Sequence, residues 1–141
     1  MSKGDYTVLY WDSSAILSVL FRDQHSDKAL KWANKDAFHL MSSLSYVETH
    51  AVASRIRREG ALADILIDAA LEVLARGPWR RLNAFPAWEI IEELAQKWPL
   101  RGADLWHLGT AKTIQKDLPE ITILSFDRRL KVAAKGEGLC I

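Results

Sequence analysis

Short apolar runs and longer helical repeats alternate along the chain. The first run, over residues 6–11, is apolar without alternation and predicts a strand buried on both faces. Residues 38–42 and 121–126 carry similar strand patterns, residues 79–82 carry a weaker one, and the closing run at 138–141 is a candidate for a further strand. Together these runs predict a sheet of four to five strands.

Apolar residues recur at helical spacing between these runs. One stripe consists of Leu62, Ile65, Leu66, Ala69, Ala70 and Val73, and a second of Trp88, Ile91, Leu94, Ala95 and Trp98. Residues 44–58 and 103–115 predict two more helices, and a helix also follows the first and the fourth strand. Strands that alternate with helices indicate a mainly parallel sheet covered on both faces. We therefore expect an α/β fold, a three-layer α/β/α sandwich around the central sheet.

Length and composition restrict the class of protein. With 141 residues, 49% of them hydrophobic, the chain is predicted to form a single domain over residues 1–141. The net charge of +1 gives no strong overall field, so nucleic-acid binding requires a local patch or a bound cation. The N-terminus shows no signal-peptide pattern, and no apolar run approaches ~18 residues, so we expect a soluble, cytoplasmic protein without a membrane partner.

Two aspartates come directly after predicted strands. Asp12 follows the first strand and Asp127 follows the run at 121–126, and a helix begins after each. Helix capping explains either residue alone, because Asp is a preferred N-cap. Ser13 can cap the first helix instead, which leaves Asp12 free for other chemistry. Because parallel strands end at one edge of a sheet, the two carboxylates meet if their strands are neighbours.

Glu48 and Asp104 lie on the inward faces of two predicted helices. Glu48 is in line with apolar residues of its helix, where a carboxylate is costly unless it is paired or bound to metal. Its alternative explanation is a capping box with Ser45. Asp104 lies in the first turn of its helix, where a cap or a favourable position in the helix dipole also explains it.

Other polar residues have plainer explanations. Asp64, Asp68 and Glu72 share a face opposite an apolar stripe, which indicates a solvated surface. The four histidines show no spacing typical of metal ligands. We therefore expect His107 to make local hydrogen bonds rather than to bind metal.

Four carboxylates in one site repel one another unless positive charge or protonation neutralises them. Each pair at ~4–5 Å costs about 3–4 kcal/mol at an effective dielectric near 20, so one or more would take up a proton. A hard divalent cation such as Mg²⁺ or Mn²⁺ removes this repulsion, because it prefers oxygen ligands. Such a site suits phosphoryl chemistry, since the cation stabilises charge on a phosphate.

Four segments carry these acids, namely YWDSSAIL, SLSYVETHAVAS, LRGADLWHLGTA and LSFDRRLKVAAKGEG. In this order and spacing they resemble the four acidic motifs of PIN-domain ribonucleases. More closely, they resemble VapC-like toxins of type II toxin–antitoxin systems. The resemblance extends from about residue 6 to residue 141 and implies a PIN-like fold.

The resemblance also implies a set of roles. Asp12, Glu48, Asp104 and Asp127 match the four acids as metal ligands and catalytic residues. Ser13 matches the hydroxyl residue after the first acid, and Ser45 the small polar residue before the second. The family implies Mg²⁺- or Mn²⁺-dependent cleavage of RNA, a homodimer and a cognate antitoxin. Two residues depart from the family pattern, the bulky Trp11 and the mid-helix Gly109.

The expected reaction is hydrolysis of RNA phosphodiester bonds with water activated at one or two metal ions. Arg128 and Arg129 follow a proposed ligand and are candidates for contacts with RNA phosphates. Trp106 is a candidate for stacking on an unpaired base, although burial in the core is the more common role for a tryptophan.

Two other classes use similar features. A phospho-acceptor signalling domain requires an aspartate after a central strand, whereas the run at 38–42 ends in serines. A haloacid-dehalogenase-like phosphatase requires Asp-x-Asp, but Ser14 stands where the second aspartate belongs. A non-catalytic protein-binding module on a PIN fold is the third alternative, and divalent-metal binding distinguishes it from a nuclease.

Overall fold

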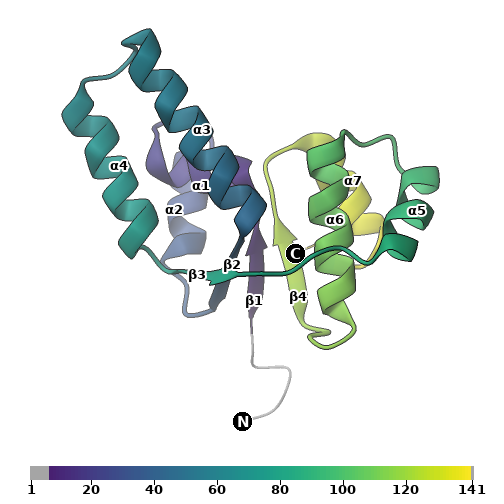
Figure 1. Cartoon of the computed structure of the whole chain (residues 1–141). Helices are drawn as coiled ribbons and strands as arrows, with labels where there is room; N and C mark the ends of the chain where they lie inside the picture. Colours follow the sequence, from purple (N-terminus) through teal and green to yellow (C-terminus); the bar gives the residue numbers. More distant parts are fainter. Residues whose placement is uncertain (1–6, 141) are drawn as a thin grey trace.

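The computed structural model describes residues 7–140, which contain four strands and seven helices (Figure 1). In chain order they are β1 (Val8–Trp11), α1 (Ser13–Leu20), α2 (Ser26–Ala33), β2 (Phe38–Ser42), α3 (Ser43–Glu59), α4 (Asp64–Arg76), β3 (Trp79–Leu82), α5 (Trp88–Lys97), α6 (Gly102–Gln115), β4 (Ile121–Leu124) and α7 (Arg128–Gly136). Among the described residues, no helix has the length and apolar character needed to cross a membrane.

The four strands form one parallel sheet in the order β3-β2-β1-β4. Tyr10, near the middle of the sheet, pairs in register with Leu40 of β2 and Ile123 of β4. This confirms the predicted parallel sheet. The closing run at 138–141 does not form a strand within the described residues, since it adds only a bridge between Ile123 and Cys140, and residue 141 lies outside them.

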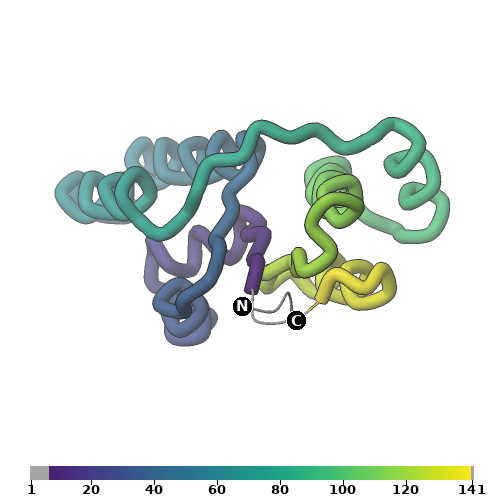
Figure 2. Tube along the Cα trace, turned by 90° about the horizontal axis from the view of Figure 1, so that it is seen from below, coloured from purple at the N-terminus to yellow at the C-terminus, as the bar shows by residue number. Residues whose placement is uncertain are grey.

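Two hydrophobic clusters cover the two faces of the sheet, and β1 contributes to both. Val8 and Tyr10 belong to a cluster with residues of α5, α6 and α7. Leu9 and Trp11 belong to a second cluster with residues of α1 and α4. Helices α1–α4 accordingly lie on one side of the strands and α5–α7 on the other (Figures 1 and 2). The predicted three-layer α/β/α arrangement is confirmed.

The apolar stripe predicted for α4 is not the face that the helix buries, so this prediction is wrong. Helix α4 buries Ile67, Ala70 and Leu74, while Ile65 is 75% exposed and Leu66 54% exposed. The helix packs on α1 and α3 at the margin of its layer, so only one of its apolar faces is covered. The uncovered face is available to a partner.

Gly109 allows α6 to approach α5 closely. A Cβ at this position would overlap the Ile91 side chain and lie 3.1 Å from Cβ of Pro86. Gly109 is buried, so the space that a side chain would need is filled by the neighbouring helix. This contact accounts for a glycine in mid-helix, where it costs about 1 kcal/mol relative to alanine.

Candidate functional site

The carboxyl ends of β1 and β4 lie side by side at the point where the strand order reverses. Strands β2 and β3 extend the sheet on one side of β1, and β4 lies on the other, so a crevice is expected beyond the ends of β1 and β4. The backbone N–H of Asp12 donates to the carbonyl of Leu124 over 3.1 Å. The two strands are neighbours, which is the condition for Asp12 and Asp127 to share one edge.

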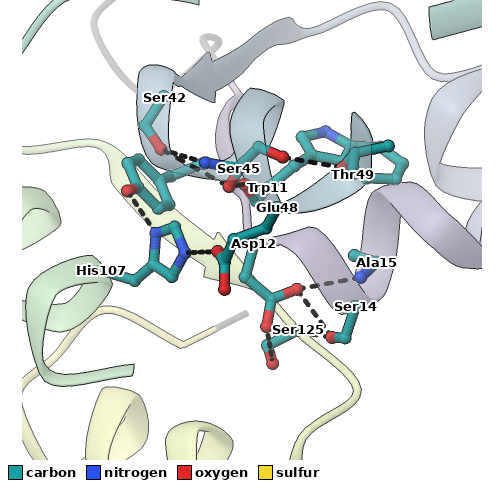
Figure 3. Close-up of polar contacts among 11 residues, drawn as sticks. Trp11, Asp12, Ser14, Ala15, Ser42, Ser45, Glu48, Thr49, His107 and Ser125 are labelled. Atoms are coloured by element: carbon teal, nitrogen blue, oxygen red, sulfur yellow. Dashed lines mark hydrogen bonds and ion pairs between the residues drawn. The ribbon is translucent and has the colours of Figure 1, made fainter. Parts of the chain in front are cut away.

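Asp12 is buried at the tip of β1 and surrounded by donors (Figure 3). Its carboxylate accepts hydrogen bonds from the Ser14 hydroxyl at 2.7 Å, the Ala15 N–H at 2.9 Å and the Ser125 hydroxyl at 2.5 Å. The Ser14 hydroxyl also lies 2.9 Å from the second carboxylate oxygen, so each oxygen receives two contacts and the carboxylate is held in one orientation. Burial raises the pKa of Asp12, and the hydrogen bonds from Ser125, Ala15 and Ser14 oppose that shift.

Asp12 itself caps α1, so the expectation that Ser13 would do so is wrong. The extended backbone of Asp12 directs its side chain at the N–H of Ala15, which is the usual geometry of an N-cap. Ser13 is the first residue of the helix, and within the described part of the chain its side chain makes no hydrogen bond that supports Asp12. The hydroxyls that do so belong to Ser14 and Ser125, so capping and site geometry coincide in one carboxylate.

Glu48 binds a histidine and forms no capping box. Helix α3 is capped by Ser42, whose hydroxyl accepts from the N–H of Ser45 at 3.1 Å. Ser45 in turn donates its hydroxyl to the carbonyl of Trp11 at 3.2 Å, which ties the start of α3 to the tip of β1. One turn later, the Glu48 carboxylate lies 3.0 Å from Nε2 of His107 (Figure 3).

His107 makes hydrogen bonds, as expected, but with residues distant in the chain rather than local ones. Its Nδ1 lies 2.7 Å from the Tyr10 hydroxyl, and both side chains are buried. The half-buried Trp106 packs edge-on against the His107 ring, with 5.6 Å between ring centroids. Base stacking by Trp106 therefore stays a prediction.

Asp104 and Asp127 complete the set of acids. Asp127 caps α7 by accepting from the N–H of Leu130 at 3.0 Å, and Asp104 lies half-buried in the first turn of α6. Burial raises the pKa of Asp104, and the negative charges of Asp127, Asp12 and Glu48 raise it further. The four acids therefore share one electrostatic environment.

The side chains do not, however, form a closed set of metal ligands. Among residues 7–140, no three His, Cys, Asp or Glu side chains are grouped closely enough to hold an ion. The structure thus places the acids at one edge of the sheet without bringing them into contact with one another. Their donors are all oxygens and they repel one another, which fits a hard divalent cation better than a transition metal that prefers nitrogen or sulfur.

Three arginines border the acids. Arg101, Arg128 and Arg129 line a hollow of about 350 Å³ together with Asp104 and Asp127. Arg128 and Arg129 were candidates from the sequence, whereas Arg101 was not. Its position three residues before Asp104, at the N-cap of α6, is the signal that could have identified it.

Replacing Asp104 with asparagine is expected to stabilise the metal-free protein at neutral pH. The folded state raises the pKa of Asp104, so the unfolded chain releases this proton first and stability falls as the pH rises from the ordinary aspartate pKa through the raised one. Asparagine abolishes this fall. Because the side chain is partly exposed and the helix dipole acts in the opposite sense, we expect a gain of only about 0.5 kcal/mol.

Thermal unfolding of both proteins in chelator between pH 3 and pH 8 measures this effect. The stability of the variant relative to wild type should increase with pH over the acidic range. A difference in stability that does not change with pH would show that the folded state does not raise the pKa of Asp104.

The sequence also matches a known family over most of its length, the PIN domain at residues 9–136. This chain belongs to the PIN domain family. The PIN domain is 27% identical over 139 residues to Ribonuclease VapC35 of Mycobacterium tuberculosis, with 95% of each chain covered.

Two solved structures share the fold of this PIN domain. One is Mycobacterium tuberculosis VapC20, described as a Sarcin-Ricin loop cleaving toxin, with a TM-score of 0.58, 14% identity and coverage of 89% and 94% of the two chains. The other is VapBC2 from Rickettsia felis bound to a DNA fragment from its promoter, with a TM-score of 0.57, 13% identity and coverage of 86% and 100%. The resemblance to PIN domains and VapC proteins is thereby confirmed.

Proposed function

We propose that this PIN domain is a VapC-like toxin that hydrolyses RNA phosphodiester bonds with Mg²⁺ or Mn²⁺. The observation that carries the proposal is the gathering of four acids at one edge of the sheet, where burial and then the charges of Asp127, Asp12 and Glu48 raise the pKa of Asp104. In the described part of the chain, no lysine or arginine forms an ion pair with any of the four. We therefore expect a bound cation to neutralise the repulsion among the four acids.

The residues present fit such a cation. Hydrogen bonds hold Asp12 in one orientation at the tip of β1, Asp104 and Asp127 line one hollow, and all four acids offer oxygen ligands. When bound, a divalent cation would stabilise negative charge on a phosphate. Asp12, Glu48, Asp104 and Asp127 would hold it, directly or through water.

The arginines supply the surface for RNA. Arg101, Arg128 and Arg129 carry positive charge next to the acids, in a chain whose net charge is only +1. Phosphates that flank the bond to be cut can pair with them, and these contacts position the strand without reading its sequence.

Replacing Arg101 with alanine is expected to weaken RNA binding for all sequences alike. Loss of one phosphate contact to a single strand lowers the slope of log K against log salt concentration by about 0.7. Binding is measured at several salt concentrations in an Asp12→Asn background, so that the RNA stays intact. Arg76→Ala, at the other end of the sheet, is the matched control and should leave the slope unchanged. An unchanged slope in Arg101→Ala would show that Arg101 does not contact RNA phosphates.

Partners are proposed from the exposed apolar side chains. Val47 on α3 is 61% exposed, Ile65 on α4 is 75% exposed, and Phe85 and Trp88 near α5 are 78% and 83% exposed. Large exposed apolar groups are typical of surfaces that bind other proteins. A second copy of the chain and a cognate antitoxin are the partners that this function requires.

The second candidate function is a non-catalytic protein-binding module, which the same apolar side chains favour. One experiment distinguishes the two functions. Total RNA is incubated with the purified protein in Mg²⁺, in Mn²⁺ and in chelator, and the new 5′ ends are sequenced. The nuclease predicts discrete cuts that require metal. Intact RNA under every metal condition, with no metal binding, would leave the binding module as the function.

A further inference from the structure

We propose that His107 is a positioning residue that, held by Tyr10, fixes the Glu48 carboxylate for metal binding. The inference rests on the proposed function and adds to it two residues that do not themselves bind the metal. Two contacts join Tyr10 in the core of the sheet, through His107, to Glu48.

The three side chains come from three different elements. Tyr10 lies in β1, His107 in α6 and Glu48 in α3, so the contacts join the sheet to helices of both layers. The Tyr10 hydroxyl is 2.7 Å from Nδ1 of His107, and Nε2 of His107 is 3.0 Å from Oε1 of Glu48. Tyr10 and His107 are buried, while the Glu48 side chain is 30% exposed. The contacts thus lead from a rigid interior to an accessible acid.

The chemistry of the three groups sets the direction of each hydrogen bond. An ionised carboxylate only accepts, so Nε2–H of His107 donates to Glu48. In a neutral imidazole the other nitrogen then accepts, and the Tyr10 hydroxyl donates to it. Burial raises the pKa of Tyr10, so its proton remains in place. The Glu48 carboxylate therefore sets the tautomer of His107, and the Tyr10 hydroxyl stabilises that tautomer by donating to Nδ1.

Holding Glu48 in this way prepares the site. Oε1 is occupied by His107, so Oε2 is the oxygen left for a cation or its water. A free glutamate would have to be ordered when the cation binds, whereas this one is ordered when the protein folds. Outer hydrogen-bond partners of metal ligands typically change metal affinity 10–100-fold when they are removed.

A purely structural role for His107 does not account for its outer contact. A core histidine needs partners for its nitrogens, and the Tyr10 hydroxyl already supplies one from the interior. The other partner is the partly exposed Glu48 carboxylate, which receives no other hydrogen bond or ion pair within residues 7–140. Direct metal binding by His107 is also disfavoured, because its Nε2 points at Glu48 and its Nδ1 at Tyr10.

The test uses three variants of the full chain and Mn²⁺ as the probe. His107→Leu keeps the volume and removes the donor, His107→Gln restores a donor near the position of Nε2, and Tyr10→Phe removes only the hydroxyl. Mn²⁺ affinity is measured by electron paramagnetic resonance, and the His107 tautomer by ¹⁵N nuclear magnetic resonance. We expect His107→Leu to bind Mn²⁺ 10–100-fold more weakly, and His107→Gln to recover most of the loss. Wild type should show the Nε2–H tautomer, and Tyr10→Phe should bind Mn²⁺ more weakly because the His107 ring loses its contact at Nδ1.

The outcomes separate this inference from the proposed function. Wild-type Mn²⁺ affinity in His107→Leu, or an Nδ1–H tautomer in wild type, would overturn the positioning role alone. Failure of wild type itself to bind Mn²⁺ would overturn the proposed function and the positioning role together. If His107→Leu does not fold, Mn²⁺ affinity in Tyr10→Phe decides instead, because this change removes a single oxygen: weaker binding supports the role and unchanged binding contradicts it.

Discussion

Replacing Asp12 with asparagine is expected to lower RNA cleavage by at least about 100-fold. The change removes the most deeply buried of the four charges while keeping the size of the side chain. Charge stabilisation by a metal ion contributes several kcal/mol to such reactions, and each 1.36 kcal/mol corresponds to a factor of ten in rate. Cleavage of a defined RNA in Mg²⁺ or Mn²⁺ measures the effect.

Two features make this variant a fair test. Asparagine is as good an N-cap as aspartate, so the start of α1 should remain intact. Asp117→Asn provides a control with the same change in charge, because Asp117 is exposed in the α6–β4 connection at the other end of the sheet. Asp117→Asn should cleave like wild type. Equal activity in Asp12→Asn would show that this carboxylate takes no part in catalysis.

Divalent cations are expected to stabilise the wild-type protein markedly. A ligand that binds only the folded state at about 100 times its Kd adds ~2.7 kcal/mol to the free energy of unfolding. The physical reason is that a cation offsets the burial and the carboxylate repulsion that together raise the pKa of Asp104. Thermal unfolding with increasing Mn²⁺, compared with the same buffer containing chelator, measures this gain.

Variants of the four acids should be stabilised less by divalent cations than wild type is. Asp12→Asn and Asp104→Asn remove one ligand each, so Mn²⁺ should raise their unfolding temperatures much less than that of wild type. Asp117→Asn is again the control and should respond fully. Equal stabilisation of all these proteins would place the cation elsewhere on the molecule.

The sequence predicted the sheet well because the pattern of β1 is unambiguous. A run of four apolar residues followed by Asp12 requires cover on both faces, which only a central strand of a layered sheet provides. The end of β4 was less clear. Phe126 extends the apolar pattern beyond Ser125, yet the strand stops at Leu124, because the Ser125 hydroxyl donates to Asp12 and the N–H of Phe126 donates to Ser14.

Contacts between distant segments could not be predicted. His107 lies 59 positions from Glu48 and 97 from Tyr10, and no local pattern relates the three. Arg101 borders the acids only because α6 begins near the tip of β4, next to α7. These residues become apparent only from tertiary packing.

Helical periodicity also failed where one helix carries two apolar faces. On α4, Ile65, Leu66 and Val73 fit the period as well as the residues that are buried. Spacing alone does not show which face packs on α3 and which face stays exposed. Helix α2, over Ser26–Ala33, was not anticipated, because its eight residues bury only Ser26 and Ala29.

Titration of Mn²⁺ into wild type, Asp12→Asn, Glu48→Gln, Asp104→Asn and Asp127→Asn, followed by electron paramagnetic resonance, tests the central claim most directly. If four carboxylates from β1, α3, α6 and α7 serve one metal site, wild type binds Mn²⁺ and every one of the four variants binds it more weakly. Wild-type affinity in all four variants, or no binding by wild type, would contradict the account.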